Sequence, residues 1–378
     1  MIKVLIGDIF ESGAQTLVNT VNTVGVMGKG IALGFRERFP EMYDDYVRRC
    51  QRHEVQLGRP YLYRRATPPN VLNFPTKEHW RSVSRLSDIV RGLEYLRSHM
   101  TEWGVTSLAV PPLGCGEGKL EWRVVGPTLY RGLSQLEIPV ELYAPFGTPH
   151  EELHPDFFVT ERRHEELRSG QVETAGLPFR IEPGWVALVA ILEQVRRQRY
   201  HWPVGRVGFQ KVAYFATEVG IPTGLSYRRG SYGPYASEIK QVLSRLINNG
   251  LIVERKLGRM LSTDVGPTFD DAKKGYQSFL AEWQPKIDKV VDLVVRMNTD
   301  DAEIAATVHF AAARLCEEKK ARPTESEILH YVMQWKLRRR PPLEESEVAL
   351  AIRRLNVLAW IDADASSDLP VPEEAMIA

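Results

Sequence analysis

The stretch Ser107-Leu108-Ala109-Val110-Pro111-Pro112-Leu113-Gly114-Cys115-Gly116-Glu117-Gly118 decides the fold of the N-terminal part of the chain. Its first four residues have the length and apolar character of a buried strand, and its last five form a glycine-rich loop. A helix is predicted directly afterwards, from Glu121 to Leu133. A strand, a glycine loop and a helix in this order present backbone N–H groups that can bind a phosphate.

A second glycine loop has the same setting. Gly25-Val26-Met27-Gly28-Lys29-Gly30 follows a predicted strand at 16–19 and leads into a predicted helix at 31–39. Around the two loops, strands and helices alternate, with strands expected at 2–6, 61–63, 71–74 and 140–143 and helices at 41–50 and 87–103. This alternation predicts an α/β fold with a largely parallel sheet covered by helices on both faces. Both loops would then lie at the carboxyl edge of the sheet, where ligands of such folds bind.

Neither loop is one of the common nucleotide-binding motifs. Gly28-Lys29 is followed by Gly30 rather than by Ser or Thr, which excludes a P-loop. No Gly-x-Gly-x-x-Gly follows the first predicted strand, which argues against a dinucleotide-binding Rossmann domain.

Composition limits the class of protein. The 378 residues, 43% of them apolar, suggest two or three globular domains. The net charge of +1 excludes a protein that coats nucleic acid through bulk positive potential, but not one that recognises a specific group on it. Three widely spaced cysteines, no signal peptide and no long apolar run predict a cytosolic protein without disulfides. No Cys/His cluster has zinc-ligand spacing, so neither a metal nor a cofactor is expected.

The second half of the chain has a mainly helical pattern. A polar linker is expected at 149–180, a helical domain at 181–365 and a disordered tail at 366–378. Helices are predicted at 185–197, 209–219, 235–249, 287–297, 302–318, 325–338 and 344–355, with a hairpin of 251–253 and 259–261 around Gly258. Helix, helix and hairpin follow one another in a winged-helix-like order.

Four ordered motifs in the first 146 residues resemble those of the macrodomain family, a module that binds ADP-ribose. They are Gly7-Asp8-Ile9, Val18-Asn19-Thr20-Val21-Asn22, Gly28-Lys29-Gly30-Ile31-Ala32 and Pro112-Leu113-Gly114-Cys115-Gly116. The stretches Asn73 to Lys77 and Leu120-Glu121-Trp122 resemble the DarG antitoxins within that family. The resemblance implies a macrodomain over 1–148, built as an α/β/α sandwich on a mixed, largely parallel sheet. It also implies that this domain hydrolyses the N-glycosidic bond joining ADP-ribose to bases of single-stranded DNA.

The same resemblance implies roles for individual residues. Asp8 would accept the adenine amino group, with the backbone of Ile9 beside it, and the amides of Asn19 and Asn22 would lie near the distal ribose. The two glycine loops would hold the diphosphate from two sides, and Tyr143 or Phe146 would stack on adenine. The full set of implied ADP-ribose contacts is Asp8, Ile9, Asn19, Asn22, Gly28, Lys29, Gly30, Ile31, Thr76, Leu113, Gly114, Cys115, Gly116, Gly118, Lys119, Leu120 and Tyr143.

Lys77 is the residue that the resemblance implies for the chemistry at the anomeric carbon. A nucleophilic lysine must be neutral, so burial or a nearby cation has to lower its pKa. The terminal ADP-ribose glycohydrolase of animals, which the resemblance places in the same branch, carries an aspartate where this chain has Gly118, so Glu117 is only a candidate acid. Cys115 has no histidine placed to activate it and is better explained as a small loop residue. Trp80 and Arg81 suit stacking on an unpaired base, or packing on their own domain.

The second half contains the string Gly230-Ser231-Tyr232-Gly233-Pro234-Tyr235, which resembles the C-terminal region of DarG antitoxins. The resemblance implies that this domain binds a DarT-like toxin, an ADP-ribosyltransferase of DNA. Arg228-Arg229 and 336–340 are basic runs that could touch nucleic acid or simply be solvated, and Asp300, Asp301 and Glu303 are candidate toxin contacts. Other readings are a hydrolase of protein-linked ADP-ribose or O-acetyl-ADP-ribose, a non-catalytic ADP-ribose reader and a winged-helix regulator.

Overall fold

The computed structural model describes residues 2–158, 180–258 and 260–371, and divides the chain into two compact units. The units are discontinuous in sequence. The first comprises Met1–Glu182, Ser244–Val253 and Gly266–Gln277, and the second comprises Pro183–Leu243, Glu254–Val265 and Ser278–Ala378. Most of the linker expected at 149–180 and the end of the tail expected at 366–378 lie outside the described residues.

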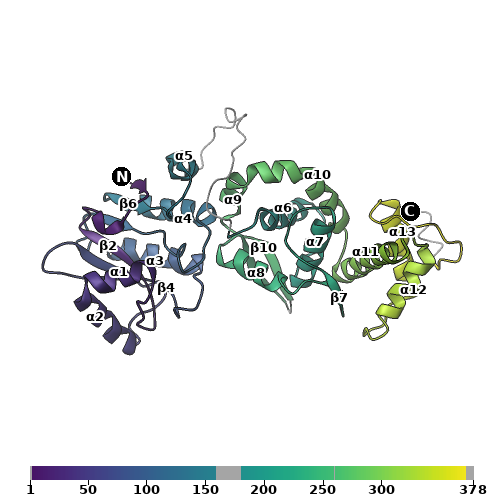
Figure 1. Cartoon of the computed structure of the whole chain (residues 1–378), viewed down its shortest axis with the longest axis horizontal. Coiled ribbons are helices and arrows are strands. Elements are labelled where there is room, and N and C mark those ends of the chain that lie inside the picture. The colour runs from purple at the N-terminus through teal and green to yellow at the C-terminus, as the bar shows by residue number, and fades with distance from the viewer. Residues whose placement is uncertain (1, 159–179, 259, 372–378) are drawn as a thin grey trace. The chain divides into compact units, whose positions relative to one another are not determined.

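A six-stranded sheet forms the centre of the first unit (Figure 1). The strand order is β1-β6-β5-β2-β4-β3. All neighbours pair in parallel except β3, which runs antiparallel to β4 at the edge. The prediction of a mixed, largely parallel sheet is therefore confirmed. The strands are β1 (Ile2–Leu5), β2 (Thr16–Asn22), β3 (Tyr61–Tyr63), β4 (Asn70–Lys77), β5 (Leu108–Val110) and β6 (Val140–Tyr143).

Helices cover both faces of this sheet, because successive strand residues point to opposite sides. Leu17, Val21 and Val71 pack in one core with side chains of α1 (Gly30–Arg38) and α2 (Pro40–Gln51). Phe74 points to the other face, where it lies against Gly92 of α3 (Leu86–His99). The remaining helical segments of this region are η1 (Ile9–Glu11), α4 (Trp122–Ser134), η2 (His150–Leu153) and α5 (Pro155–Phe158).

The second half of the chain is mainly helical, as predicted. Its helices are α6 (Pro183–Arg197), α7 (Arg206–Glu218), α8 (Ile239–Asn248), α9 (Phe269–Gly275), α10 (Gln277–Val294), α11 (Thr299–Lys319), α12 (Glu325–Trp335) and α13 (Glu345–Val357). The hairpin expected around Gly258 is present as β9 (Ile252–Leu257) and β10 (Met260–Val265). A further hairpin, β7 (Arg228–Gly230) and β8 (Gly233–Tyr235), occupies residues where the sequence predicted no strand.

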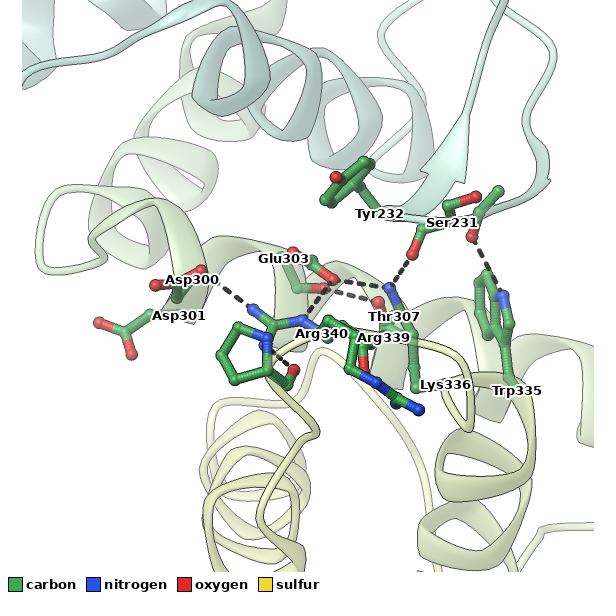
Figure 2. A network of polar contacts seen from close by, with 12 residues as sticks. Ser231, Tyr232, Asp300, Asp301, Glu303, Thr307, Trp335, Lys336, Arg339 and Arg340 are labelled. Carbon is green, nitrogen blue, oxygen red and sulfur yellow. Dashed lines mark hydrogen bonds and ion pairs between the residues drawn. The ribbon is translucent and has the colours of Figure 1, made fainter. Parts of the chain in front are cut away.

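Buried charges hold the β7–β8 turn in place (Figure 2). The carboxylate of Glu303 accepts from Lys336 Nζ at 2.7 Å and from Arg339 Nε at 3.3 Å. Lys336 Nζ also donates to the carbonyl of Ser231 at 2.8 Å, and Trp335 Nε1 donates to the carbonyl of Gly230 at 3.1 Å. Two segments about a hundred residues apart in sequence are thus joined by hydrogen bonds from Trp335 and from the buried Lys336.

Candidate functional site

Five loops meet at the carboxyl edge of the sheet in the first unit. Since β1, β6, β5, β2 and β4 run parallel, the segments that follow them leave on the same side. Three of these segments are the two glycine loops and the turn after Lys77, which closes β4. Lys77 Nζ donates to the carbonyl oxygen of Glu117 at 3.2 Å, so the end of β4 and the loop after β5 are in direct contact.

The loop after β5 presents unpaired backbone donors. Among the residues that the structure describes, the N–H groups of Gly116, Glu117 and Gly118 have no hydrogen-bond acceptor. The chain turns sharply at Gly114, whose φ is +77°, and a Cβ there would approach Leu120 and Ile89 to under 3 Å. Successive free N–H groups form a concavity that suits an anion.

The loop after β2 is shaped by Asn22. Its side-chain amide donates to the carbonyl of Val26 at 2.6 Å, and its side-chain oxygen accepts from the N–H groups of Val24 and Val26 and from the hydroxyl of Tyr46. Asn22 is therefore occupied in building the loop. The N–H groups of Gly28, Lys29 and Gly30 have no acceptor in the described part of the chain, and α1 begins at Gly30. The N-terminus of α1 thus adds its partial positive charge to this loop.

Asp8 and Phe146 follow the adjacent strands β1 and β6. Asp8 is exposed, and one of its carboxylate oxygens accepts from the N–H of Phe10 at 3.0 Å. Ile9 is buried. The ring of Tyr143 is only 7% exposed and its hydroxyl donates to Glu141 at 3.2 Å, whereas Phe146 is 88% exposed. Of the two aromatic residues suggested for stacking on adenine, the structure leaves Phe146 free to do so.

Asn19 of β2 is fully buried and contacts Met27 of the loop that follows β2. Its amide donates to the side-chain oxygen of Asn73 at 2.9 Å, while its own side-chain oxygen has no partner among the described residues. Thr76, Leu113 and Leu120 are also buried. These buried side chains support the loops from within the domain, and the Asn19 oxygen is a buried polar atom without a hydrogen-bond partner among the described residues.

Lys77 is half-buried at the end of β4, beside the loop that follows β5. Besides Glu117, its Nζ donates to the carbonyl of Trp80 at 3.2 Å. Burial lowers the pKa of Lys77; the charge of Glu117 opposes this shift, and that of Lys119 adds to it. Lys119 itself has φ = +62°, a left-handed conformation that is unfavourable for a side-chain-bearing residue. The site therefore holds an amine that is easier to deprotonate than an ordinary surface lysine.

Several known proteins are similar to this chain in sequence. The family model described as Macro domain matches residues 18–129. The chain contains a macro domain. A DNA ADP-ribosyl glycohydrolase of Thermus aquaticus is 36% identical over 250 residues, which cover 65% of this chain and 64% of the relative. A DNA ADP-ribosyl transferase–DNA ADP-ribosyl glycohydrolase fusion protein of Thermosipho africanus is 40% identical over 173 residues, or 40% of this chain and 45% of the relative.

Among solved structures, the macrodomain of Thermus aquaticus DarG is 44% identical, with a TM-score of 0.37, and the match covers 38% of this chain and 99% of that chain. The expected resemblance to DNA ADP-ribosyl glycohydrolases of the DarG type is confirmed by the sequence relatives. The chain spans less than two thirds of the length of the DNA ADP-ribosyl glycohydrolases it matches, at 64% for the Thermus protein.

Within the macro domain, the structure separates the candidate chemical groups around Lys77. Cys115 is buried and burial raises the pKa of its thiol, which does not suit a nucleophile. At Gly118, a Cβ would lie 2.2 Å from Ser84 Oγ and 2.5 Å from the Gly114 carbonyl oxygen, so no acidic side chain fits there. The hydrogen bond from Lys77 to Glu117 goes to the carbonyl oxygen rather than to the carboxylate.

Three residues of the macro domain region were missed by sequence reasoning. Asn73 pairs with Asn19, Ser84 packs against Gly118, and Arg180 donates to carbonyls of the 114–120 loop. Asn73 lies in a quoted motif and could have been noticed as a polar residue in a buried strand. Ser84 and Arg180 have no local pattern that points to this loop.

Two negative findings apply to the described residues. No three His, Cys, Asp or Glu side chains gather there in a way that could hold a metal ion. None of the helices described has both the length and the apolar character that crossing a membrane requires.

Proposed function

We propose that the macro domain binds ADP-ribose along the carboxyl edge of its sheet and removes it from bases of single-stranded DNA by hydrolysis of the N-glycosidic bond. The observation that carries this proposal is the placement of Lys77, an amine of lowered pKa, against the loop whose free N–H groups suit a diphosphate. The relative from Thermus aquaticus, named a DNA ADP-ribosyl glycohydrolase, supports the same substrate.

In this proposal the ADP-ribose lies across the edge with Asp8 at the adenine and the two glycine loops around the diphosphate. Phe146 stacks on the adenine ring because it is the exposed aromatic residue after β6. Asn22 acts by shaping its loop, and Asn19, whose side chain is fully buried, acts through its hydrogen bond to Asn73 rather than on the ribose itself. The anomeric carbon then falls near Lys77, at the far end of the diphosphate loop from Asp8.

Lys77 has two chemical roles open to it. As a nucleophile, its lone pair attacks the anomeric carbon while the glycosidic bond breaks with its electron pair on the base nitrogen. The amine loses one proton and the base nitrogen gains one. Water then hydrolyses the adduct to ADP-ribose and frees Lys77. As a general acid, the ammonium protonates the departing base and water attacks the sugar.

Trp80 favours an unpaired base as the attached group. Its side chain is 45% exposed next to Lys77, and the Arg81 guanidinium lies 4.4 Å from the centre of the Trp80 ring. An exposed aromatic ring beside a cation suits base stacking with a nearby phosphate.

Three variants test the proposal on an ADP-ribosylated single-stranded oligonucleotide. Lys77→Ala is expected to abolish release of ADP-ribose while leaving ADP-ribose binding intact. Lys119→Ala raises the pKa of Lys77, so at neutral pH it slows a nucleophilic amine but not a general acid. Glu117→Ala keeps the carbonyl that Lys77 contacts, and a loss as large as that of Lys77→Ala would mean that the carboxylate takes part.

Parallel assays on other substrates separate the alternatives. Release of ADP-ribose from a glutamate ester or from O-acetyl-ADP-ribose, with none from modified DNA, would replace DNA as the substrate. Binding of ADP-ribose without turnover of any of these would make the domain a reader. Full activity of Lys77→Ala on modified DNA would refute the assignment of Lys77.

We also propose that the helical region, 181–365, binds and neutralises a DarT-like ADP-ribosyltransferase. The Thermosipho africanus relative is named as a fusion of such a transferase with a glycohydrolase, which supports a functional pairing. The structure offers a presented surface at the β7–β8 turn, where Tyr232 is 68% exposed and the turn is held by Lys336 and Trp335 (Figure 2). Rigid exposed tyrosines are frequent anchors of protein interfaces.

The matched test compares Tyr232→Ala with Tyr200→Ala in the full chain, because Tyr200 is 79% exposed and lies away from the turn in sequence. Only Tyr232→Ala is expected to weaken binding of a DarT-like toxin. The winged-helix reading instead predicts that the chain binds unmodified DNA through α7, α8 and the β9–β10 hairpin. DNA binding that persists in Lys77→Ala, without affinity for the toxin, would select that reading.

A further inference from the structure

Arg180 lies beyond the residues matched by the Macro domain family, yet it contacts the loop at the centre of the site. Its Nη1 donates to the carbonyl oxygens of Cys115, Gly116 and Leu120, at 3.2 Å for each of the last two. Its backbone N–H donates to the Glu121 carboxylate at 2.8 Å. One guanidinium group therefore binds both ends of the 114–120 loop.

These contacts determine which way the loop amides point. A peptide group is planar and trans, so the carbonyl of one residue and the N–H of the next point in opposite directions. Because Arg180 binds the carbonyls of Cys115 and Gly116, the N–H groups of Gly116 and Glu117 point away from it. Both are among the N–H groups that have no acceptor in the described chain.

We infer that Arg180 is a positioning residue that keeps these amides aimed at the diphosphate of ADP-ribose; the inference rests on the function proposed above. Without the guanidinium, three carbonyl oxygens would lose a charged donor, and the glycines beside them allow the peptides to flip. A flipped peptide would turn its carbonyl oxygen towards the diphosphate, and the two negative groups would repel each other. Lys77 would also be affected, since it contacts the carbonyl of Glu117 in the same loop.

Residues distant in sequence hold Arg180 and the end of the 114–120 loop in place. Glu121, which orients the Arg180 backbone, caps α4 and donates its own N–H to Asn249 Oδ1 at 2.7 Å. Asn249 is buried, and its amide donates to the carbonyl of Arg245 at 2.8 Å. The end of the loop thus rests on a turn contributed by the second half of the chain to the first unit.

The test uses the full chain with Arg180→Ala, Arg180→Lys and, as a control, Arg131→Ala. Arg131 pairs with Asp271 at 2.7 Å in the same unit, and its guanidinium donates to Asp271 and Thr128 rather than to the loop. Calorimetry measures binding of ADP-ribose and of adenosine, which shares the adenine end but lacks the diphosphate. Arg180→Ala is expected to weaken ADP-ribose binding at least about tenfold while leaving adenosine binding unchanged. Arg180→Lys, which lacks the planar fork, is expected to recover only part of the loss.

The outcomes are distinguishable. If the wild-type chain binds ADP-ribose and Arg180→Ala binds it equally well, the inference fails and the proposed function stands. If Arg180→Ala loses adenosine and ADP-ribose affinity together, the role of Arg180 is general folding, which also overturns the inference. If Arg180→Ala does not fold, the loss of ADP-ribose affinity relative to adenosine affinity is measured for Arg180→Lys instead, and an unchanged ratio overturns the inference. A wild-type chain that binds no ADP-ribose would overturn both.

Discussion

Replacing Gly118 by alanine tests the geometry of the 114–120 loop more directly than any change of charge. The added Cβ would lie 2.2 Å from Ser84 Oγ, 2.5 Å from the Gly114 carbonyl oxygen and 2.9 Å from the Gly114 Cα. Two of these three atoms belong to the backbone, and Ser84 is fully buried with its N–H bonded to the Gly118 carbonyl at 2.9 Å. Neither neighbour can yield without moving the loop.

The expected magnitude follows from overpacking. Forcing one extra methyl group into a closed site costs about 1–3 kcal/mol of folding free energy. For a unit of this size each kcal/mol corresponds to a change in Tm of about 2–4 °C, so the expected fall in Tm is about 2–12 °C. ADP-ribose affinity should fall as well, because the strain is released by displacing the N–H groups that the loop presents.

Gly116→Ala is the matched control, since a Cβ at Gly116 meets nothing within 4 Å. Thermal unfolding and calorimetry with ADP-ribose are measured for both variants. Ser84→Ala combined with Gly118→Ala removes the closest contact but leaves the two with Gly114, so it should restore only part of the stability. If Gly118→Ala matches Gly116→Ala in both Tm and affinity, the loop is not packed as the structure shows.

Two further predictions concern the second unit. Burial lowers the pKa of His309 to about 4, so the folded chain keeps it neutral while the unfolded chain binds a proton below about 6.5. The unfolding free energy should therefore fall by about 3 kcal/mol as the pH drops from 6.5 towards 4. Urea unfolding of His309→Gln should lack this part of the pH dependence. Glu303→Gln leaves Lys336 buried without its counter-charge and should cost about 3–5 kcal/mol in the same assay. The exposed Asp300→Asn should change stability by less than about 0.5 kcal/mol, and equal effects of the two would contradict the network.

Much of the fold could be predicted from local sequence patterns. The strands of the sheet were found because their residues are short apolar runs bounded by glycine, proline or polar turns. Errors arose where a local signal competed with tertiary packing. A helix was expected from residue 287, but α10 begins at Gln277 and continues through Pro285, with buried residues on both sides of the proline. The β7–β8 hairpin was missed because strands of three residues have too little periodicity to detect.

The site was predictable to the extent that it depends on parallel strands. Once the strands were placed, Lys77 and the two glycine loops had to lie at one edge. The finer assignments depend on side-chain direction, which local patterns do not fix. Tyr143 is still within β6 and points into the core, whereas Phe146 lies three residues further on and is exposed.

What no local pattern could reveal is that the first unit is completed by chain from the second half. Asn249 binds the Glu121 N–H across 128 residues of sequence, and Asp271 pairs with Arg131 across 140. Such contacts leave no trace in periodicity, because each partner looks like an ordinary polar residue in its own segment. Their consequence is functional. Glu121 follows the 114–120 loop and orients Arg180. A fragment cut after the sheet therefore keeps every predicted ADP-ribose-binding residue but loses Arg180, which orients the amides of the loop.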